Sequence, residues 1–344
     1  MTIKTAPILT AMFAACILQS AQASDLKVIS EVREQRIDFQ SITPRNRWEF
    51  VRKVVDHTKV VTVYGDLFMP KRPPARVPAV VISHASGGVT ETLTKMWAGE
   101  LNDVGIAVFV VDSFKPRGID TTTTNQGQVD VSANVADALN ALVILSKIPQ
   151  IDSRRIFHMG GSRGGTAVME TYWPIVREAV IDSKSALKFA GHIPLFQGNC
   201  NTRFRFDDGK TSNSTPMLAL LGGADDGAPA DACMAYYTEL KNAGANIRWK
   251  VYADAPHGFD GDGPKTYLPQ GVTAKNCAIE VFITNVRGSG LGVARNYKTG
   301  QSISGFPAWD KAFADCNGRG FTYGGDRNAR KEAVKDVIQF INAN

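Results

Sequence analysis

The five residues Gly-Gly-Ser-Arg-Gly at positions 160–164 constrain the fold of this chain more than any other feature. They follow a β-forming run at residues 154–159 and precede a segment of helical character. A serine in so tight a strand-to-helix turn is held clear of the sheet, and its neighbours must be small because the backbone doubles back with little room for a Cβ atom. A helix that starts there directs N–H groups toward the serine. A tight turn with an incidental serine is the alternative interpretation.

Apolar runs alternate with helical patterns from residue 61 to the end of the chain. The predicted strands are residues 61–67, 79–83, 106–111, 154–159, 188–193, 217–221 and 247–252, and the predicted helices are residues 91–104, 129–146, 230–243 and 328–342. Strands that are apolar throughout are typical of a sheet covered on both faces. The alternation therefore predicts an α/β fold with a mostly parallel central sheet and helices on both faces, in a single domain over residues 24–344.

Two segments do not follow this alternation. Residues 198–216 are polar and loop-like, and residues 261–326 form a long, glycine-rich stretch between the last predicted strand and the last predicted helix. A stretch of that length in a compact domain usually has a function or contains secondary structure of its own. We expect residues 261–326 to form a cap or hairpin insertion beside the functional site.

Residues 1–23 have the features of a cleavable secretory signal peptide. Lys4 precedes an apolar stretch at residues 6–18 that is too short for a stable membrane span, and Ala-Gln-Ala at 21–23 matches a small-x-small cleavage site. An uncleaved anchor is the alternative. No later segment is apolar over a length that crosses a membrane, so we expect an exported protein, either secreted or periplasmic.

The cysteines fit an oxidising compartment. Cys16 leaves with the predicted signal peptide, and four cysteines remain, an even number that predicts two disulfides. Of the three possible pairings we favour Cys200–Cys233 and Cys277–Cys316, because each would clamp an irregular segment. A metal site is not expected, since the chain has no C-x-x-C pair and no paired histidines.

The charge of the chain gives a weaker constraint. The formal net charge is +6, and the basic residues are scattered along the sequence. Proteins that bind nucleic acid gather their lysines and arginines on one face or in runs. We therefore expect no nucleic-acid partner. The sequence does not indicate an oligomeric state.

Two residues in the loops after later predicted strands are suited to activate Ser162. A serine hydroxyl becomes a good nucleophile when a base removes its proton, and a histidine base needs a carboxylate to hold its tautomer. His257 and Asp225 are the candidates, and the carboxyl ends of parallel strands meet at one edge of a sheet. Asp226 is the alternative acid, and either aspartate can instead be a turn or cap residue. The sequence predicts a triad of Ser162, Asp225 and His257, in the chain order Ser-Asp-His.

Negative charge that develops next to Ser162 requires hydrogen-bond donors. The backbone N–H of Arg163, the residue after the serine, is one candidate. The other lies in the loop His-Ala-Ser-Gly-Gly at 84–88, which follows the predicted strand at 79–83. We expect the N–H of Ser86 to be this second donor and His84 to brace the loop by hydrogen bonding.

Arg117 lies in the segment Asp-Ser-Phe-Lys-Pro-Arg-Gly at 112–118, which follows the predicted strand at 106–111. A guanidinium at that strand end has the geometry to bind a substrate carboxylate in a bidentate manner. A structural salt bridge is the alternative interpretation, and it is the one we favour.

Taken together, these motifs resemble the secreted, dienelactone hydrolase-like branch of the α/β-hydrolase superfamily. The resemblance covers roughly residues 61–260 and the last helix. Its motifs are His-x-Ser-Gly-Gly at 84–88, Asp-Ser-Phe-x-Pro-Arg-Gly at 112–118, Gly-x-Ser-x-Gly at 160–164, Gly-x-x-Asp-x-x-x-Pro at 222–229 and Pro-His-Gly-Phe-Asp at 256–260. Dienelactone hydrolases proper have a cysteine nucleophile and an acidic residue in the loop at 84–88, whereas this chain has Ser162 and no acid there. Their lactone substrate therefore does not carry over.

The resemblance implies an α/β-hydrolase that cleaves a small carboxylic ester with a serine nucleophile, without a cofactor or metal. A serine peptidase of the prolyl-oligopeptidase type is the first alternative, although residues 24–60 are too few for the large additional domain of that class. A non-catalytic binding protein on the same fold is the second alternative, since a fold does not guarantee chemistry.

Overall fold

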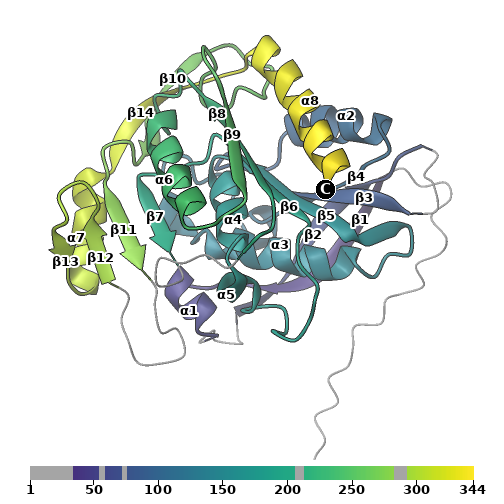
Figure 1. Ribbon diagram of the computed structural model, residues 1–344, viewed down its shortest axis with the longest axis horizontal. Helices are drawn as coiled ribbons and strands as arrows, with labels where there is room; N and C mark the ends of the chain where they lie inside the picture. Colours follow the sequence, from purple (N-terminus) through teal and green to yellow (C-terminus); the bar gives the residue numbers. More distant parts are fainter. Residues whose placement is uncertain (1–33, 54–58, 72–75, 206–212, 283–292) are drawn as a thin grey trace, which may run out of the picture. The chain divides into compact units, whose positions relative to one another are not determined.

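The computed structural model describes residues 34–53, 59–71, 76–205, 213–282 and 293–344 (Figure 1). The predicted signal peptide at residues 1–23, with Cys16, lies outside these residues. Within the described part of the chain, no helix combines the length and the apolar character that a membrane span needs.

An eight-stranded sheet forms the centre of the fold, in the order β1-β2-β4-β3-β5-β6-β8-β9 (Figure 1). Strands β1 and β2 are antiparallel to their neighbours, and the six strands from β4 to β9 run parallel. The bounds are β1 Glu34–Ile42, β2 Val60–Phe68, β3 Val77–Ser83, β4 Ala107–Asp112, β5 Ile151–Gly161, β6 Gly191–Leu195, β8 Met217–Gly222 and β9 Ile247–Tyr252. The mostly parallel sheet expected from the apolar runs is confirmed.

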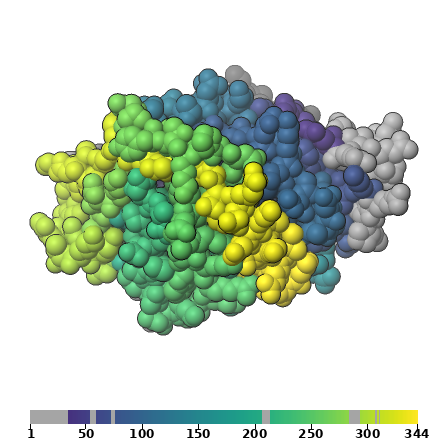
Figure 2. Space-filling view, turned by 90° about the horizontal axis from the view of Figure 1, so that it is seen from above, coloured from purple at the N-terminus to yellow at the C-terminus, as the bar shows by residue number. Residues whose placement is uncertain are grey.

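Helices cover both faces of this sheet, because alternate side chains of each strand enter two different hydrophobic clusters. In β3, Val81 belongs to the cluster that contains α3, α4 and α6, and Ile82 belongs to the cluster that contains α2 and α8. Figure 2 shows α8, in yellow, against the blue residues that include α2. The helices are α1 Arg47–Val51, α2 Ala98–Asp103, α3 Ser132–Leu145, α4 Arg163–Thr171, α5 Pro174–Arg177, α6 Ala230–Asn242, α7 Phe306–Cys316 and α8 Arg327–Ala343.

The described residues also contain three short helical turns, and the structure corrects two of the predicted elements. The turns are η2 Thr92–Trp97, which is a π-helix, and the 3₁₀ turns η3 Lys115–Arg117 and η4 Gln126–Gln128. The helix predicted over 91–104 is therefore a π-helical turn followed by α2. The strand predicted at 188–193 begins at Gly191, since pairing with β5 starts there.

Short strands lie in the two segments that showed no regular pattern. Residues 198–216 contain β7 Thr202–Arg205, and residues 261–326 contain β10 Thr266–Thr273, β11 Ile279–Phe282, β12 Val293–Asn296, β13 Ser302–Ile303, α7 and β14 Gly318–Tyr323. Strands β10 and β14 form an antiparallel pair, and β13-β12-β11-β7 form a four-stranded sheet. The two segments are thus joined, because β7 from the first pairs with β11 from the second.

Ion pairs and disulfides hold these additional strands. Buried Glu280 on β11 pairs with Arg203 and Arg205 on β7 and with Arg295 on β12. Cys200 is bonded to Cys233, which joins the segment before β7 to α6, and Cys277 is bonded to Cys316, which joins the segment before β11 to the end of α7. These are the two pairings favoured from the sequence.

Candidate active site

The turn at Ser162 depends on the close approach of two elements. Strand β5 ends at Gly161, α4 begins at Arg163, and Ser162 between them has φ 52° and ψ −114°. A non-glycine residue in this region is strained by about 1–3 kcal/mol. A Cβ atom added to Gly164 would lie 2.0 Å from the carbonyl oxygen of Ser83 at the end of β3. Glycine is therefore required there, and the serine side chain is held above the end of the sheet.

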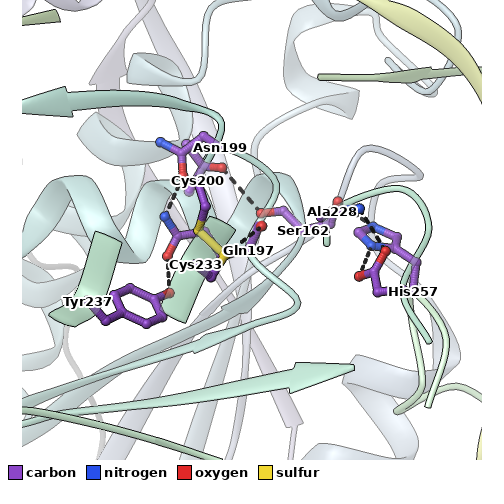
Figure 3. Close-up of a disulfide and its surroundings, with 10 residues drawn as sticks. Ser162, Gln197, Asn199, Cys200, Ala228, Cys233, Tyr237 and His257 are labelled. Atoms are coloured by element: carbon purple, nitrogen blue, oxygen red, sulfur yellow. Dashed lines mark hydrogen bonds and ion pairs between the residues drawn. A yellow bond between two sulfur atoms is a disulfide. The ribbon is translucent and has the colours of Figure 1, made fainter. Parts of the chain in front are cut away.

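Ser162, His257 and Asp225 form one hydrogen-bonded chain. Ser162 Oγ lies 2.8 Å from His257 Nε2, and His257 Nδ1 lies 2.7 Å from Asp225 Oδ2. Asp225 Oδ1 accepts hydrogen bonds from the backbone N–H groups of Gly227 and Ala228, which fixes the carboxylate. Figure 3 shows Ser162, Ala228 and His257 at this point of the molecule. The three side chains come from the ends of β5, β8 and β9, where the sequence placed them.

Asp226, the alternative acid, is hydrogen-bonded to β14. Its carboxylate accepts hydrogen bonds from the backbone N–H and the hydroxyl of Thr322 on β14, 2.7 Å and 3.1 Å away. The His257 imidazole is hydrogen-bonded to Asp225 and not to its neighbour. Asp226 therefore ties the segment at 261–326 to the loop after β8.

Aromatic rings enclose the His257 imidazole. The centroids of Phe196 and Phe321 lie 5.1 Å and 5.2 Å from that of His257, both edge-on. Tyr323 on β14 forms a β-bridge with His257, and a Cβ atom on Gly258 would lie 2.1 Å from its ring. Two of these three rings belong to β14. The sequence pattern gave no indication of them, because their register with His257 is set by tertiary pairing.

The loop at 84–88 is braced from both sides. His84 is fully buried; its Nδ1 lies 2.8 Å from the carbonyl oxygen of Ala85, and its Nε2 accepts a hydrogen bond from the backbone N–H of Ser113. Burial lowers the pKa of His84, in keeping with a neutral ring that donates at Nδ1 and accepts at Nε2. His84 therefore connects this loop to the end of β4, and Ser86 lines the cavity in front of Ser162.

Gln126 links the two candidate oxyanion residues. Its Nε2 donates to Ser86 Oγ at 2.8 Å, and its Oε1 accepts from Arg163 Nη1 at 3.1 Å. The Arg163 guanidinium also donates to Asn134 Oδ1 and to the carbonyl oxygen of Val129. Burial lowers the pKa of Arg163 to about 10. Gln126 was not singled out in the sequence, where an isolated glutamine in a polar loop carries no signal.

Arg117 is used within the fold, as the favoured salt-bridge interpretation expects, and the substrate-binding interpretation of this residue is thereby corrected. Its Nη1 and Nη2 donate to Asp137 at 2.8 Å and 2.9 Å, and its remaining partners are the carbonyl oxygens of Ile42 and Ser113 and the hydroxyl of Thr43. The Arg117 and Asp137 side chains are 5% and 0% exposed. Arg117 is not among the described residues that line the cavity. The salt-bridge alternative therefore holds, since every guanidinium nitrogen already has an acceptor.

A cavity of about 960 Å³ opens over Ser162 and His257. This volume is at the upper end of the range of small-molecule sites. Its walls combine polar groups, among them Thr166, Asn199 and Arg47, with aromatic rings from α1, β7, α7 and β14. Within the described residues, no group of histidines, cysteines and carboxylates is arranged to hold a metal ion.

A partly buried ion cluster forms part of one wall of this cavity. Arg47 on α1 pairs with Glu170 on α4 and, at 3.4 Å, with Asp130, and its guanidinium lies over the ring of Phe204. Burial raises the pKa of Glu170 to about 7 against the opposing effect of Arg47. The partners are far apart in the sequence, so no local pattern predicts this cluster.

The strand order, the turn at Ser162 and the Ser-Asp-His arrangement at the carboxyl ends of the strands define an α/β-hydrolase. The signature of the dienelactone hydrolase family matches residues 63–282. The chain belongs to this family, and it is a carboxylic ester hydrolase that acts on a small molecule. The resemblance to dienelactone hydrolase-like α/β-hydrolases noted in the sequence is thereby confirmed.

The likeness to solved structures is limited. Thermogutta terrifontis esterase 2 phosphonylated by cyclosarin is 18% identical, with a TM-score of 0.46 over 58% of this chain and 80% of that chain. Est1E from Butyrivibrio proteoclasticus is 16% identical, with a TM-score of 0.43 over 57% of this chain and 86% of that chain. Sequence identities and TM-scores this low support no inference about the substrate of this protein. No curated protein matches the sequence.

Proposed function

We propose that this protein is an exported serine hydrolase that cleaves its ester through a covalent acyl-enzyme. The observation that carries the proposal is the hydrogen-bonded chain from Asp225 through His257 to Ser162, with distances of 2.7 Å and 2.8 Å. Both distances are within the range needed for proton transfer and for holding a tautomer. The family membership supplies the reaction class.

In the proposed acylation step, Ser162 Oγ attacks the ester carbonyl carbon while His257 Nε2 takes the hydroxyl proton. His257 then gives this proton to the leaving alcohol as the tetrahedral intermediate collapses. Asp225 stays ionised and stabilises the imidazolium through Nδ1–H. In deacylation, water attacks the acyl-enzyme with the same histidine as base, and the acid and free Ser162 are released.

Two backbone N–H groups are proposed to bind the oxyanion, those of Ser86 and Arg163. Both residues line the cavity next to Ser162, and Gln126 ties their side chains together. Loss of one such donor typically reduces kcat by about 10²–10³-fold. We further propose that β10 and β14 of the segment at 261–326 act as a cap over His257, within the single domain at 24–344.

Export is the remaining part of the proposal. The features of residues 1–23 favour a cleaved signal peptide, and both disulfides require an oxidising compartment to persist. N-terminal sequencing of protein recovered from outside the cytoplasm should begin at Ser24. A start at Met1 would contradict this proposal.

The test of the mechanism is to treat the purified protein with a fluorophosphonate and to map the modified peptide by mass spectrometry. We expect one adduct, on Ser162. Ser162→Ala should lower kcat by about a million-fold, and Asp225→Asn by about 10⁴-fold, at unchanged stability. Asp226→Asn is the matched control and should retain wild-type turnover, since an amide oxygen can still accept from Thr322. If the folded protein is not labelled, a non-catalytic binding protein on the same fold is the better description.

A further inference from the structure

The loop at residues 121–126 is hydrogen-bonded to Ser86 at three points. The Ser86 carbonyl oxygen accepts from the backbone N–H of Thr122 at 2.8 Å and from the hydroxyl of Thr121 at 2.9 Å. Ser86 Oγ accepts from Gln126 Nε2 at 2.8 Å. The polar groups of Ser86 other than its backbone N–H are thus used to hold the residue in place, and this N–H is the donor proposed for the oxyanion.

Arg163 decides the orientation of the Gln126 amide. A guanidinium has only donors, so the Gln126 atom that lies 3.1 Å from Arg163 Nη1 must be the amide oxygen. The hydroxyl of Thr122, a fully buried residue, donates to the same oxygen at 3.2 Å. The amide nitrogen is therefore the atom that faces Ser86 Oγ. One orientation of the Gln126 side chain satisfies all three contacts.

The Arg163 end of this link is rigid. Arg163 Nε donates to Asn134 Oδ1 at 3.0 Å, Arg163 Nη2 donates to the carbonyl oxygen of Val129 at 2.6 Å, and the residue is 7% exposed. Arg163 is also the first residue of α4, where backbone N–H groups have no acceptor within the helix. The two proposed oxyanion donors thus belong to different segments of the chain, and the Gln126 side chain joins the residues that carry them.

The loop at 121–126 is also bonded to the cap strands. The backbone N–H of Val272 on β10 donates to the carbonyl oxygen of Thr123 at 2.9 Å, and Arg319 Nη1 on β14 donates to the carbonyl oxygen of Thr124 at 3.2 Å. The position of the loop is therefore set by bonds within the protein before a substrate binds. Donors that are held in advance need no reorganisation when charge develops in the transition state.

We propose that Gln126 is a positioning residue of the oxyanion hole, because its amide sets the separation between the backbone N–H groups of Ser86 and Arg163. The inference rests on the proposed role of these two donors. Without the amide, the glycine-rich loop at 84–88 is held to α4 at one point fewer. A misplacement of about 1 Å in a catalytic site lowers the rate by about 100-fold. Because the oxyanion forms only after Ser162 attacks, loss of Gln126 should act on the transition state and leave substrate binding unchanged.

The experiment compares Gln126→Leu with Gln128→Leu. Leucine is close to glutamine in size and neither donates nor accepts a hydrogen bond. Gln128 is the matched control, because it is an exposed glutamine of the same turn, η4, and its amide donates within the loop to the carbonyl oxygens of Thr121 and Asn125. The measurements are kcat and KM for p-nitrophenyl butanoate and the inhibition constant of 1,1,1-trifluoro-2-pentanone. This ketone has the same propyl chain and forms an oxyanion when Ser162 adds to its carbonyl carbon.

The expected result is a loss confined to the transition state. Gln126→Leu should lower kcat and kcat/KM equally, by about 10- to 100-fold, as for an interaction made only in the transition state. The inhibition constant of the ketone should rise by a similar factor, because its adduct requires the same two donors. Gln128→Leu should leave all three constants as in the wild type. If Gln126→Leu does not fold by circular dichroism, Gln126→Met, which is unbranched and also lacks the amide, takes its place.

A double-mutant cycle shows whether Gln126 acts through Ser86. Ser86→Ala keeps the backbone N–H and removes the Oγ atom that the Gln126 amide binds. If both substitutions break the same link, their effects on kcat are not multiplicative, and the double variant should lose no more than about threefold beyond the weaker of the two single variants. Losses that multiply would show that Gln126 acts by another route and would contradict the inference.

Two further results would overturn the inference: a folded Gln126→Leu protein with wild-type kcat, or a lower kcat with an unchanged inhibition constant for the ketone. Labelling of wild-type Ser162 by a fluorophosphonate keeps this failure separate from failure of the proposed function. A wild-type protein that is labelled and active, with a Gln126→Leu variant that matches it, refutes the role of Gln126 alone. A folded wild-type protein that is neither labelled nor active refutes both.

Discussion

The contact between Gly164 and the end of β3 sets the distance between the nucleophile and the loop with the proposed oxyanion donor. In a Gly164→Ala variant, the new Cβ would lie 2.0 Å from Ser83 O, 2.8 Å from Ser83 C and 2.9 Å from His84 O. All three atoms belong to the backbone, so no side chain can rotate away. Contacts under 3.0 Å are essentially not found for real Cβ atoms. The start of α4 and the end of β3 must therefore separate by about 1 Å.

This displacement has two consequences of different size. Overpacking in a buried contact costs about 1–3 kcal/mol of unfolding free energy. The catalytic effect is larger, because Ser162 lies on one side of the contact and the loop with Ser86 on the other. A misplacement of about 1 Å in such a site reduces the rate by about 100-fold. In Gly160→Ala the added Cβ lies 2.6 Å from Ser83 O, so both effects should be smaller there.

The assay combines urea unfolding with kcat for p-nitrophenyl butanoate, normalised to the sites that a fluorophosphonate titrates. Gly99→Ala on α2 is the matched control, since its Cβ would meet nothing within 4 Å. Alanine there should be neutral or stabilise the helix by up to about 1 kcal/mol, with unchanged kcat. The order of the loss in kcat should be Gly164, then Gly160, then Gly99. A Gly164→Ala protein with wild-type kcat and stability would refute the reasoning.

Three further changes test other parts of the structure. His84→Phe leaves the buried Ser113 N–H without a partner and the Ala85 carbonyl oxygen with the Gly88 N–H alone, and it should lower kcat by about tenfold and stability by about 2 kcal/mol, by kinetics and urea unfolding. Burial raises the pKa of Glu170 from 4.5 to about 7, so its contribution to stability is complete below pH 4.5 and is lost as the pH rises through 7. Glu170→Gln should remove on the order of 1–3 kcal/mol of this pH dependence, and an unchanged slope between about pH 5 and pH 8 would contradict the assignment. Replacing Cys200 and Cys233 with alanine should lower the unfolding free energy by about 3–4 kcal/mol, as loop entropy predicts for a separation of 33 residues; guanidinium unfolding measures it, and a loss below about 1 kcal/mol would count against it.

Local patterns in the sequence were sufficient to predict most strands of the central sheet. Runs of β-forming and apolar residues located β2, β3, β4, β5, β8 and β9, and β6 with a shifted start, and the glycine-flanked Ser162 identified the turn into α4. Because parallel strands all end at one edge, position along the chain alone placed Asp225 and His257 near the serine. These features depend on residues close in sequence, where periodicity is informative.

The rest of the site depends on contacts between distant residues. Arg117 and Asp137, or Arg47 and Glu170, pair only because helices and strands bring them together, and an arginine alone does not reveal its partner. Strand β1, at the edge of the sheet, alternates polar and apolar residues over Glu34–Ile42, and it was not assigned because that signal is weak in an isolated strand. The strands in 261–326 are too short for periodicity to identify.

The residues at the ends of the central strands and the walls of the cavity come from different stretches of the chain. Ser162 and Asp225 are held by the parallel sheet, whereas the rings of Trp48, Trp309 and Phe321 belong to α1, α7 and β14. A change in those rings reshapes the cavity without moving the strand ends. The reaction and the choice of substrate are therefore subject to separate constraints during divergence. Replacing the segments at 45–48 or 261–326 with others therefore offers a way to alter substrate selectivity while the catalytic residues stay unchanged.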